Sequence, residues 1–374
     1  MKQVNVLYAL VRRPKGGVET YIYNVHKHIN KSLVHIDYII GDYDSTDIFV
    51  KKIESMGSHV YVLPEIKLTN IVDFFSELNS FLKSNKQYDI IHCHSAISAV
   101  FYLLIAKKNG IKHRIIHGHS SKYSDKGIIK SIRNYILTLP VKHLANHYFS
   151  CSVGVGEFLY GEKYVKQNKV FIAKNAIHAE KFRFNFNIRQ KVREDLGLKD
   201  KFVIGHVGRF SPVKNHTFII DIFDAVYKKN KQSVLLLIGT GELQNYIKEK
   251  VRKLNLENSV LFMGWRDDIN MLLQAIDVFI LPSKFEGLPL SCIEAQAAGV
   301  PCILSDNITK EVKITNLVVF KSIEDSAEEW ADEILYFLDK KEQRKDTYQN
   351  IIEAGYDIKS EVQKLEKYYM SLLN

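Results

Sequence analysis

The stretch of sequence that decides the fold covers residues 275–298 and reads AIDVFILPSKFEGLPLSCIEAQAA. It begins with an apolar run of strand length that ends near Leu281, and from Leu290 onward it has helical periodicity and is rich in alanine. Gly287 and Pro289 therefore mark a loop that joins a strand to a helix. Such a loop directs free backbone N–H groups and the positive end of a helix toward its ligand, which suits a phosphate.

Two carboxylates stand eight positions apart around this loop, Glu286 within it and Glu294 in the helix that follows. Because like charges repel, neither should contact a phosphate directly, and each is better suited to accept hydrogen bonds from hydroxyl groups. The ligand implied carries both phosphate and hydroxyls, as a nucleotide sugar does. Taken alone, two glutamates are more often solvated on a loop and a helix face.

A second segment, residues 202–216, also reads as a strand, a glycine-containing turn and a helix start. Arg209 and Lys214 stand at this turn, and such a pair can neutralise the charge that gathers on a departing diphosphate. A third loop, Gly239–Glu242, follows another apolar strand. Loops on successive strand ends meet at one edge of a parallel sheet, where ligands bind in open α/β folds.

These motifs resemble those of the family 4 glycosyltransferases, which are retaining nucleotide-sugar enzymes. The cations Arg209 and Lys214, the glycine loop, residues 262–265 and the glutamate pair occur in the family's order. The resemblance covers nearly the whole chain, is strongest from about residue 200 to residue 310, and is closest to the branch that assembles exopolysaccharide and capsule repeat units. It implies the α/β fold called GT-B, in which two doubly wound Rossmann-like domains face a central cleft.

The resemblance also implies a role for each matching residue. Catalysis would involve four residues: His119 beside the transferred sugar, Arg209 and Lys214 on the leaving diphosphate, and Glu286 on sugar hydroxyls. Donor binding would involve nine more residues: Gly16, Gly17, Gly241, Arg266, Gly287, Leu288, Leu290, Ser291 and Glu294. Glu294 would accept hydrogen bonds from the ribose, and the backbone of residues 264–266 would contact the base. No side chain is expected to act as general base, because a diphosphate oxygen would take the acceptor's proton.

The activity implied is retaining transfer of a hexose from a nucleotide diphosphate sugar, most simply a UDP-sugar. The acceptor would be a saccharide or a saccharide linked to polyprenyl diphosphate. No cofactor is expected. A sugar-nucleotide epimerase shares this layout, but the first half of the chain offers no clear acidic pair for proton abstraction. A nucleic-acid-binding protein would explain the basic charge but not the paired glutamates, so we expect no nucleic-acid partner.

Charge divides the chain into two parts. Residues 1–178 contain 24 Lys and Arg against 13 Asp and Glu, a formal charge of +11, whereas the remainder is near neutral. This asymmetry predicts an N-terminal acceptor-side domain at residues 1–178 that faces an anionic partner, and a nucleotide-sugar-binding domain at residues 179–357. Residues 358–374 resemble the family helix that crosses back onto the first domain.

Composition points to a cytoplasmic protein. The chain begins with an apolar strand pattern at residues 2–10 instead of a secretory leader, and no apolar run approaches the roughly 20 residues of a membrane-spanning helix. Its four cysteines are scattered without paired spacing, at Cys93, Cys151, Cys292 and Cys302. Reduced thiols are the simplest interpretation.

Two His-x-His pairs, His92 with His94 and His117 with His119, follow apolar strand patterns. Four imidazoles at this spacing are compatible with a metal site. We expect metal independence instead, because enzymes of the resembled fold bind the diphosphate with cations and helix ends. The alternative for His92, His94 and His117 is a structural role, with the rings capping strand ends through backbone hydrogen bonds.

Residues 126–147 contain an amphipathic helix pattern. Apolar side chains recur from Ile128 to Leu139 among cations that include Lys126, Lys130 and Arg133. This pattern is compatible with an interfacial helix on an anionic membrane surface, and equally with a core-facing helix that has a solvated basic side. Membrane contact would make the protein peripheral at the inner membrane face.

Overall fold

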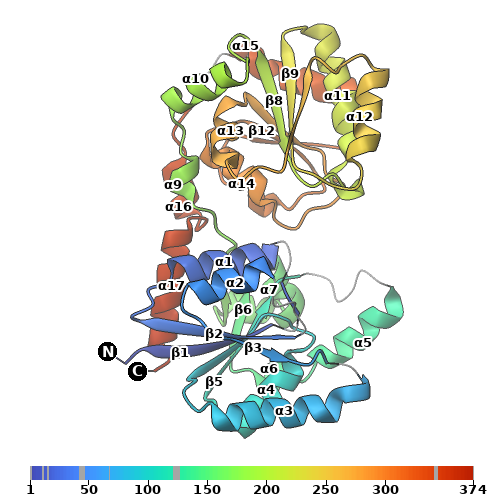
Figure 1. Cartoon of the computed structure of the whole chain (residues 1–374). Coiled ribbons are helices and arrows are strands. Elements are labelled where there is room, and N and C mark those ends of the chain that lie inside the picture. The colour runs from blue at the N-terminus through green and yellow to red at the C-terminus, as the bar shows by residue number, and fades with distance from the viewer. Residues whose placement is uncertain are drawn as a thin grey trace. The chain divides into compact units, whose positions relative to one another are not determined.

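The computed structural model describes residues 2–10, 12–14, 17–41, 47–66, 68–120, 127–340 and 344–373. The chain forms two compact units, shown in Figure 1. Unit 1 comprises Met1–Ala176 together with Ile358–Asn374, and unit 2 comprises Ile177–Asp357. Each unit is a parallel sheet covered by helices on both faces, which confirms the predicted doubly wound α/β class.

The sheet of unit 1 has the strand order β3-β2-β1-β4-β5-β6-β7, and every pair of neighbours in it is parallel. Its strands are rich in apolar residues because helices cover both faces of the sheet. The strands are β1 (Val4–Leu10), β2 (Val34–Gly41), β3 (Val60–Leu63), β4 (Ile90–Cys93), β5 (His113–Gly118), β6 (His147–Ser150) and β7 (Val170–Ile172).

The helices of unit 1 form two layers, each packed on one face of the sheet. One layer contains α1 (Gly17–His28), α2 (Ile48–Ser55) and α17 (Ile358–Ser371). The other contains α3 (Ile71–Ser84), α4 (Ala99–Lys108), α6 (Val141–Leu144) and α7 (Val153–Tyr160). The remaining elements are the 3-10 helix η1 (Leu68–Asn70), α5 (Ile128–Thr138) and α8 (Glu162–Lys166).

The sheet of unit 2 has the order β10-β9-β8-β11-β12-β13 and is again parallel between all neighbours. Its strands are β8 (Phe202–Val207), β9 (Ser233–Ile238), β10 (Val260–Gly264), β11 (Val278–Leu281), β12 (Cys302–Ser305) and β13 (Val318–Lys321). One face packs against α9 (Ala179–Phe182), α10 (Phe186–Asp195), α13 (Ile269–Ala275), α14 (Leu290–Ala297) and α16 (Tyr348–Glu353). The other packs against α11 (His216–Lys229), α12 (Gln244–Lys253) and α15 (Ala327–Lys340). Two 3-10 helices, η2 (Pro212–Lys214) and η3 (Lys310–Val312), complete the unit.

The strand order reverses once in each sheet, between β1 and β4 in unit 1 and between β8 and β11 in unit 2. At such a point the loops leaving two adjacent strands turn to opposite faces of the sheet, which opens a crevice at their carboxyl ends. The loops after β8 and β11 are those that carry Lys214 and Glu286. The topology therefore brings the two motifs together although more than 70 residues separate them in the chain.

The last helix, α17, belongs to unit 1 although it follows unit 2 in the sequence. Ile358, Val362, Leu365 and Tyr369 are buried in the cluster that covers β1 and β2. The Tyr369 hydroxyl lies 3.0 Å from the hydroxyl of Tyr8 on β1. Unit 1 is thus completed by the end of the chain.

We predict that Leu365→Ala destabilises unit 1 in particular. Leu365 is buried in its core, and truncation of a buried leucine costs about 2–5 kcal/mol of unfolding free energy through lost burial and the cavity left behind. Urea unfolding followed by hydrogen exchange in each unit should show the loss in unit 1 while unit 2 keeps its stability. Gln363→Ala, an exposed position on the same helix, is the matched control and should change neither unit.

Candidate active site

The loops after β8 and β11 are tied together by backbone and side-chain hydrogen bonds. The Lys284 N–H donates to the Val213 carbonyl over 2.9 Å, and the Asn215 side-chain amide donates to the Pro282 carbonyl over 3.2 Å. Asn215 adopts the left-handed conformation with φ 57°, which asparagine tolerates better than most residues. The two loops therefore form one platform in which Lys214 has a defined position.

Lys214 and Glu286 meet across this platform. The Lys214 Nζ lies 2.7 Å from the Glu286 Oε1, and the two side chains are only 18% and 16% exposed. Gly208 makes room for the lysine, because a Cβ at Gly208 would lie 3.2 Å from the Lys214 Cδ and Cε atoms and 2.8 Å from the His206 Nε2. A half-buried cation at a sheet edge can attract an anionic ligand while its carboxylate partner accepts hydrogen bonds from neighbouring hydroxyls.

Arg209 occupies a different position from Lys214. Its side chain is 74% exposed and its Nη2 pairs with the Glu242 carboxylate at 3.1 Å, so it is held only by an ion pair at the surface. Its backbone is fixed by the neighbouring loop, since Gly208 donates to the Ile238 carbonyl and Phe210 to the Thr240 carbonyl. The structure brings Arg209 together with the Gly239–Glu242 loop but shows no contact between Arg209 and Lys214 among the described residues.

Gly241 is required by the close approach of these two loops. A Cβ built on Gly241 would lie 2.5 Å from the Phe210 carbonyl oxygen, a backbone atom that cannot easily move. The small loop therefore packs directly against the turn that carries Arg209. A side chain at position 241 is therefore excluded by packing, independently of any ligand.

The helix start after the β11 loop contains four of the predicted donor-binding positions. Gly287 is exposed, and a Cβ there would meet nothing within 4 Å. Leu288 and Leu290 pack partly against the core, while Ser291 lies in the first turn of α14. Pro289 caps this helix without a side-chain hydrogen bond, and its carbonyl accepts a hydrogen bond from the Cys292 N–H over 3.1 Å.

Glu294 lies in the second turn of α14 and is half-buried. No hydrogen bond or ion pair to its carboxylate is found within the described part of the chain. Burial raises the pKa of Glu294 from 4.5 to about 7, because the charged form loses its hydration. A carboxylate that is desolvated without a protein partner is positioned to accept hydrogen bonds from a ligand.

Arg266 is the remaining predicted donor-binding residue of unit 2. It follows β10 and forms an ion pair with Asp268, 2.6 Å from its Nη2 to the carboxylate oxygen. The Gly264 carbonyl in the same turn accepts a hydrogen bond from Gly239 over 2.8 Å. The turn after β10 is therefore attached to the loop after β9, next to the platform.

Two histidines lie beside Lys214 that the sequence alone did not identify as site residues. His206, on β8, and His216, at the start of α11, are both buried, with ring centroids 4.8 Å apart. His206 Nδ1 lies 3.0 Å from the Ile280 carbonyl, which leaves Nε2 as the unprotonated nitrogen. Burial is the main cause that lowers the pKa of both rings, and nearby Lys214 adds to it. Their spacing in the sequence carries no signal, because only the fold brings them to the lysine.

In unit 1 the carboxyl ends of β4 and β5 bring the two His-x-His pairs into one stack. The His92 and His94 rings stack with centroids 4.4 Å apart, and the His117 and His119 rings with centroids 4.0 Å apart. His94 Nδ1 and His119 Nε2 are 3.0 Å apart, and His92 Nε2 and His117 Nδ1 are 3.2 Å apart. His92 Nδ1 also contacts the Tyr369 hydroxyl at 2.6 Å.

The expectation of backbone capping is wrong for His92, because its two ring nitrogens both contact side chains. Parallel pairing of β4 with β5 places the histidines side by side, so imidazoles become each other's partners. Burial lowers the pKa of His119 to about 3 and those of His92, His94 and His117 well below their usual range. All four rings are therefore neutral at physiological pH.

Neutral imidazole is also the form that binds metals, and ring nitrogens of His92, His94 and His117 lie within 4.8 Å of one another. Ligation by His92 would require one of its two side-chain hydrogen bonds to break. His94 Nε2 and His117 Nε2 are buried without a partner in the described part of the chain. The group is thus compatible with a metal ion but is already organised without one.

The predicted glycines after β1 fall partly outside the described residues. Gly16 is not described. Gly17 begins α1, and its carbonyl accepts a hydrogen bond of 3.1 Å from the Asn175 side chain. Asn175 also stands 3.3 Å from the position that a Cβ on Gly17 would take.

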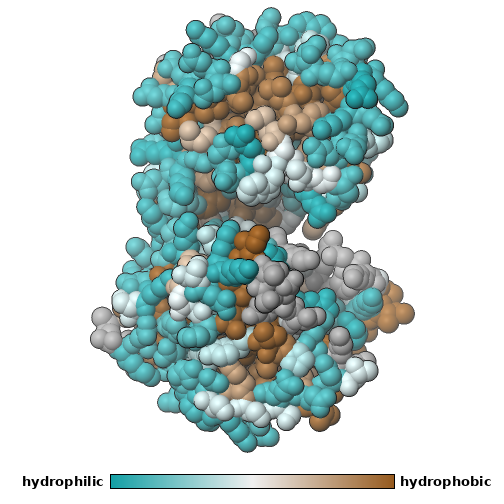
Figure 2. Space-filling model, viewed as in Figure 1, coloured by the Kyte–Doolittle hydropathy of each residue, from teal (hydrophilic) through white to brown (hydrophobic). Residues whose placement is uncertain are grey.

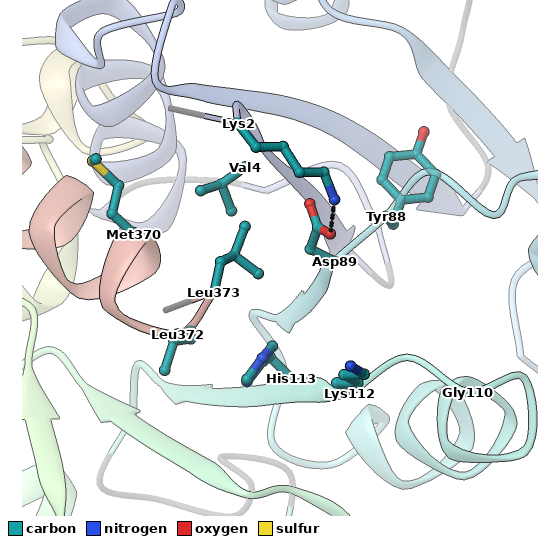
Figure 3. Close-up of a pocket in the computed structure, with 10 residues that line it drawn as sticks. All are labelled: Lys2, Val4, Tyr88, Asp89, Gly110, Lys112, His113, Met370, Leu372 and Leu373. Atoms are coloured by element: carbon teal, nitrogen blue, oxygen red, sulfur yellow. Dashed lines mark hydrogen bonds and ion pairs between the residues drawn. The ribbon is translucent and has the colours of Figure 1, made fainter.

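A cavity of about 480 Å³ in unit 1 does not coincide with any of these groups (Figure 3). It lies at the amino ends of β1, β4 and β5, where Lys2 pairs with Asp89 at 2.9 Å, and Leu372 and Leu373 of the chain's last turn line it. Ligands of open parallel sheets bind at the carboxyl ends of strands, which is the opposite edge. We therefore do not place the active site there.

Two Rossmann-like units with these loops define the class of GT-B glycosyltransferases. Residues 15–181 match the family described as Glycosyltransferase Family 4, and residues 188–354 match Glycosyl transferases group 1. The chain is 31% identical to EpsF of Bacillus subtilis (strain 168), which is assigned as a glycosyltransferase, over 98% of this chain and 96% of that protein. The chain therefore belongs to glycosyltransferase family 4.

Two further comparisons bear on fold and chemistry. The chain is 32% identical to UDP-Gal:alpha-D-GlcNAc-diphosphoundecaprenol alpha-1,3-galactosyltransferase of Escherichia coli, over 61% of this chain and 60% of that enzyme. The structure of Anabaena HepE in complex with UDP superimposes with a TM-score of 0.78 over 99% of this chain and all of that chain, at 18% identity. HepE has also been crystallised with UDP-glucose, with a TM-score of 0.73 to this chain. At this identity the likeness shows the shared GT-B fold.

We predict that Glu294→Gln stabilises the ligand-free protein at alkaline pH. Because the folded-state pKa is raised, the folded protein holds a proton that the unfolded chain has released between about pH 4.5 and 7, so this contribution is complete below that window and lost above it. The uncharged glutamine should therefore raise the unfolding free energy at about pH 8 by roughly 3 kcal/mol, and not at about pH 4. Denaturant unfolding at both pH values measures this.

The control for this experiment is Glu257→Gln, an exposed position of the same unit that should leave the pH dependence unchanged. An identical pH dependence in wild type and Glu294→Gln would mean that the carboxylate of Glu294 is solvated in the folded protein.

Proposed function

We propose that the protein is a retaining hexosyltransferase that uses a UDP-sugar and a saccharide or lipid-linked saccharide acceptor in exopolysaccharide or capsule assembly. The observation that carries the proposal is the half-buried Lys214–Glu286 pair at the strand-order reversal of unit 2. The UDP complexes of HepE support a uridine nucleotide, and the Escherichia coli relative supports a UDP-hexose with a diphosphate-linked acceptor.

In this proposal unit 2 binds the donor. Lys214 and Arg209 stabilise the charge that develops on the departing diphosphate, helped by the N–H groups of Leu290 and Ser291 at the start of α14. Glu286 accepts hydrogen bonds from sugar hydroxyls, which requires it to share or release Lys214 when the donor enters. Glu294 accepts hydrogen bonds from the ribose, and the turn that contains Arg266 contacts the base.

The transfer step breaks the bond between the sugar's anomeric carbon and the diphosphate oxygen and forms a bond from that carbon to the acceptor oxygen. The acceptor's proton passes to the diphosphate oxygen on the same face of the sugar, so retention needs no side chain as general base. The neutral ring of His119 is suited to steady the positively charged sugar, because it adds no competing charge. We propose that no metal takes part, since the cations and helix N–H groups compensate the diphosphate.

We predict that Lys214→Ala lowers turnover by roughly 100-fold or more with the fold intact, because one charge-assisted contact to the leaving group is lost. Release of UDP from a panel of UDP-hexoses is the measurement, and circular dichroism verifies the fold. Lys284→Ala is the matched control, since Lys284 is an exposed lysine on the adjoining loop. Excess EDTA should leave wild-type turnover unchanged.

If folded Lys214→Ala turned over at the wild-type rate, Lys214 would have no role in stabilising the leaving group. Loss of turnover in EDTA that a divalent ion restores would contradict metal independence and would favour the histidine group as a metal site.

The acceptor side of the proposal involves α5. Its apolar side chains face solvent instead of the core, with Ile128 76% and Ile129 81% exposed, and Asn134 is its one buried residue among those described. Figure 2 shows hydrophobic residues at the surface of unit 1 where Figure 1 draws α5. No helix in the described ranges is long and apolar enough to cross a membrane. We propose that α5 lies in the headgroup layer of an anionic bilayer, with Lys130 and Arg133 beside the phosphates.

We predict that the protein floats with vesicles that contain anionic lipid and is released as salt rises, because each surface cation contributes about 1 kcal/mol and is screened over about 8 Å at physiological salt. Changing Lys126, Lys130 and Arg133 together to Glu should abolish flotation; Lys126 lies outside the described residues. Changing Lys107, Lys108 and Lys112, which lie outside α5, to Glu alters the net charge equally and should weaken flotation only slightly. Equal flotation with zwitterionic vesicles would show that attraction between these cations and anionic headgroups does not drive binding.

A further inference from the structure

Three metal-binding side chains gather at the amino ends of β2 and β3, at the edge of the unit 1 sheet opposite the stack formed by the two His-x-His pairs. His35 and Asp37 are alternate residues of β2 and share one face of the strand, and His59 directly precedes β3. Each residue offers one ligand atom, and the three atoms lie within 4.8 Å of one another. None of these residues has a role in the proposed transfer reaction.

The pairing of β2 with β3 brings the group together, and the two strands lie side by side in Figure 1. Register places Tyr38 beside Val60, so Asp37 and His59 are neighbours at the start of the ladder. The Tyr38 N–H donates to the His59 carbonyl over 2.9 Å, and the His59 N–H donates to Asp37 Oδ1 over 2.8 Å. The backbone therefore holds His59 against the carboxylate, although the two residues are 22 positions apart in the chain.

Asp37 is a buried carboxylate whose charge no lysine or arginine balances in the described part of the chain. It is 3% exposed, and its ion-pair contacts there are to imidazoles, with His35 Nε2 at 3.0 Å and His59 Nδ1 at 3.6 Å from Oδ1. An imidazole is a cation only when it is protonated. Removing an anion from water without a cationic partner is unfavourable, so a bound cation would offset this cost.

Geometry and ligand type both suit Zn²⁺. Two imidazole nitrogens and a carboxylate oxygen form a common zinc set at bond lengths of about 2.0–2.2 Å, which puts tetrahedral ligand atoms roughly 3.3 Å apart. The two contacts to Asp37 Oδ1, 3.0 and 3.6 Å, lie on either side of that separation. His35 would carry its ring proton on Nδ1 to free Nε2 for the ion, and His59 is 75% exposed, so its ring can turn toward the same point. The fourth position is left to water.

The carboxylate is also oriented by a neighbouring hydroxyl. Tyr88 donates to Asp37 Oδ2 over 2.8 Å, which leaves Oδ1 to the two histidines. Partners of this kind fix the ligands of metal sites and raise affinity. The buried group of His92, His94 and His117 is less suited, because it has no carboxylate to neutralise the ion and His92 would have to break a hydrogen bond. Zinc should therefore prefer the group at β2 and β3.

We propose that His35, Asp37 and His59 bind Zn²⁺ and that the ion cross-links β3 to β2. β3 is the edge strand of the described sheet, has four residues and pairs with β2, so a bond at its start adds a second attachment. The role is structural. The ion lies at the opposite edge of the sheet from His119 and takes no part in sugar transfer, so the site is independent of the proposed transferase function and of the effect of EDTA on turnover.

Zinc chloride is titrated by calorimetry into the untagged full-length protein after treatment with EDTA and removal of the chelator. We expect one Zn²⁺ per chain. His59→Asn or His35→Gln should weaken binding at least about tenfold, since loss of even a residue that supports a ligand costs about 10–100-fold. His143→Asn, at an exposed histidine of the same unit, is the matched control and should bind zinc like the wild type. Zinc should also raise the melting temperature and slow hydrogen exchange at the amides of β3, in the wild type but not in His59→Asn.

Three results of the titration would overturn the site. They are absence of binding by the wild type, equal affinity in His59→Asn and the wild type, and binding that His94→Gln removes while His59→Asn retains it, which would place the ion in the histidine stack. Zinc that slows exchange elsewhere in unit 1 but not in β3 would contradict the cross-link. Because His59 is exposed, His59→Asn should keep the wild-type fold and turnover. Parallel loss of zinc and of turnover in this variant would contradict the structural role.

Discussion

The structure of the candidate site depends on one constraint, the parallel pairing of β8 with β11 across the point where strand order reverses. Register places Ile204 beside Val278, so the loops that leave the two strands begin next to each other. Hydrogen bonds from Lys284 and Asn215 then join the loops, and Lys214 meets Glu286 at 2.7 Å. A slip of one residue would turn the side chains of either strand to the other face, and the pair would be lost.

Burial shifts pKa values in opposite directions in the two units, raising that of a carboxyl group in unit 2 and lowering those of imidazoles in unit 1. In unit 2 desolvation raises the pKa of Glu294 to about 7. The ionised carboxylate therefore lowers the unfolding free energy of the ligand-free protein, while it remains available to accept hydrogen bonds from a ligand. In unit 1 desolvation lowers the pKa of His119 to about 3 and keeps the whole histidine stack neutral. The stack reaches α17 through Tyr369, so the last helix of the chain holds the first unit's polar centre in place.

Unit 1 combines features that together favour an amphiphilic acceptor. The first 178 residues carry a formal charge of +11, and α5 exposes an apolar face. Either of these features alone is common on a protein surface. These features meet at α5, where the exposed apolar side chains lie beside the cations Lys130 and Arg133, as an interfacial helix requires.

The sequence by itself determined the fold class and the order of its motifs. Apolar runs followed by glycine turns and helical periodicity are local signals, so the loops after β8, β9 and β11 were readable, as was the amphipathic pattern of α5. Only the tertiary structure decided which of these residues meet. The contact of Lys214 with Glu286, the pairing of His94 with His119 and the place of His206 beside the lysine depend on strand order, which periodicity does not encode. Likewise, an amphipathic helix pattern does not tell whether other elements cover the apolar side of the helix. The structure shows the apolar side of α5 facing solvent, because no other element packs over it in the described part of the chain.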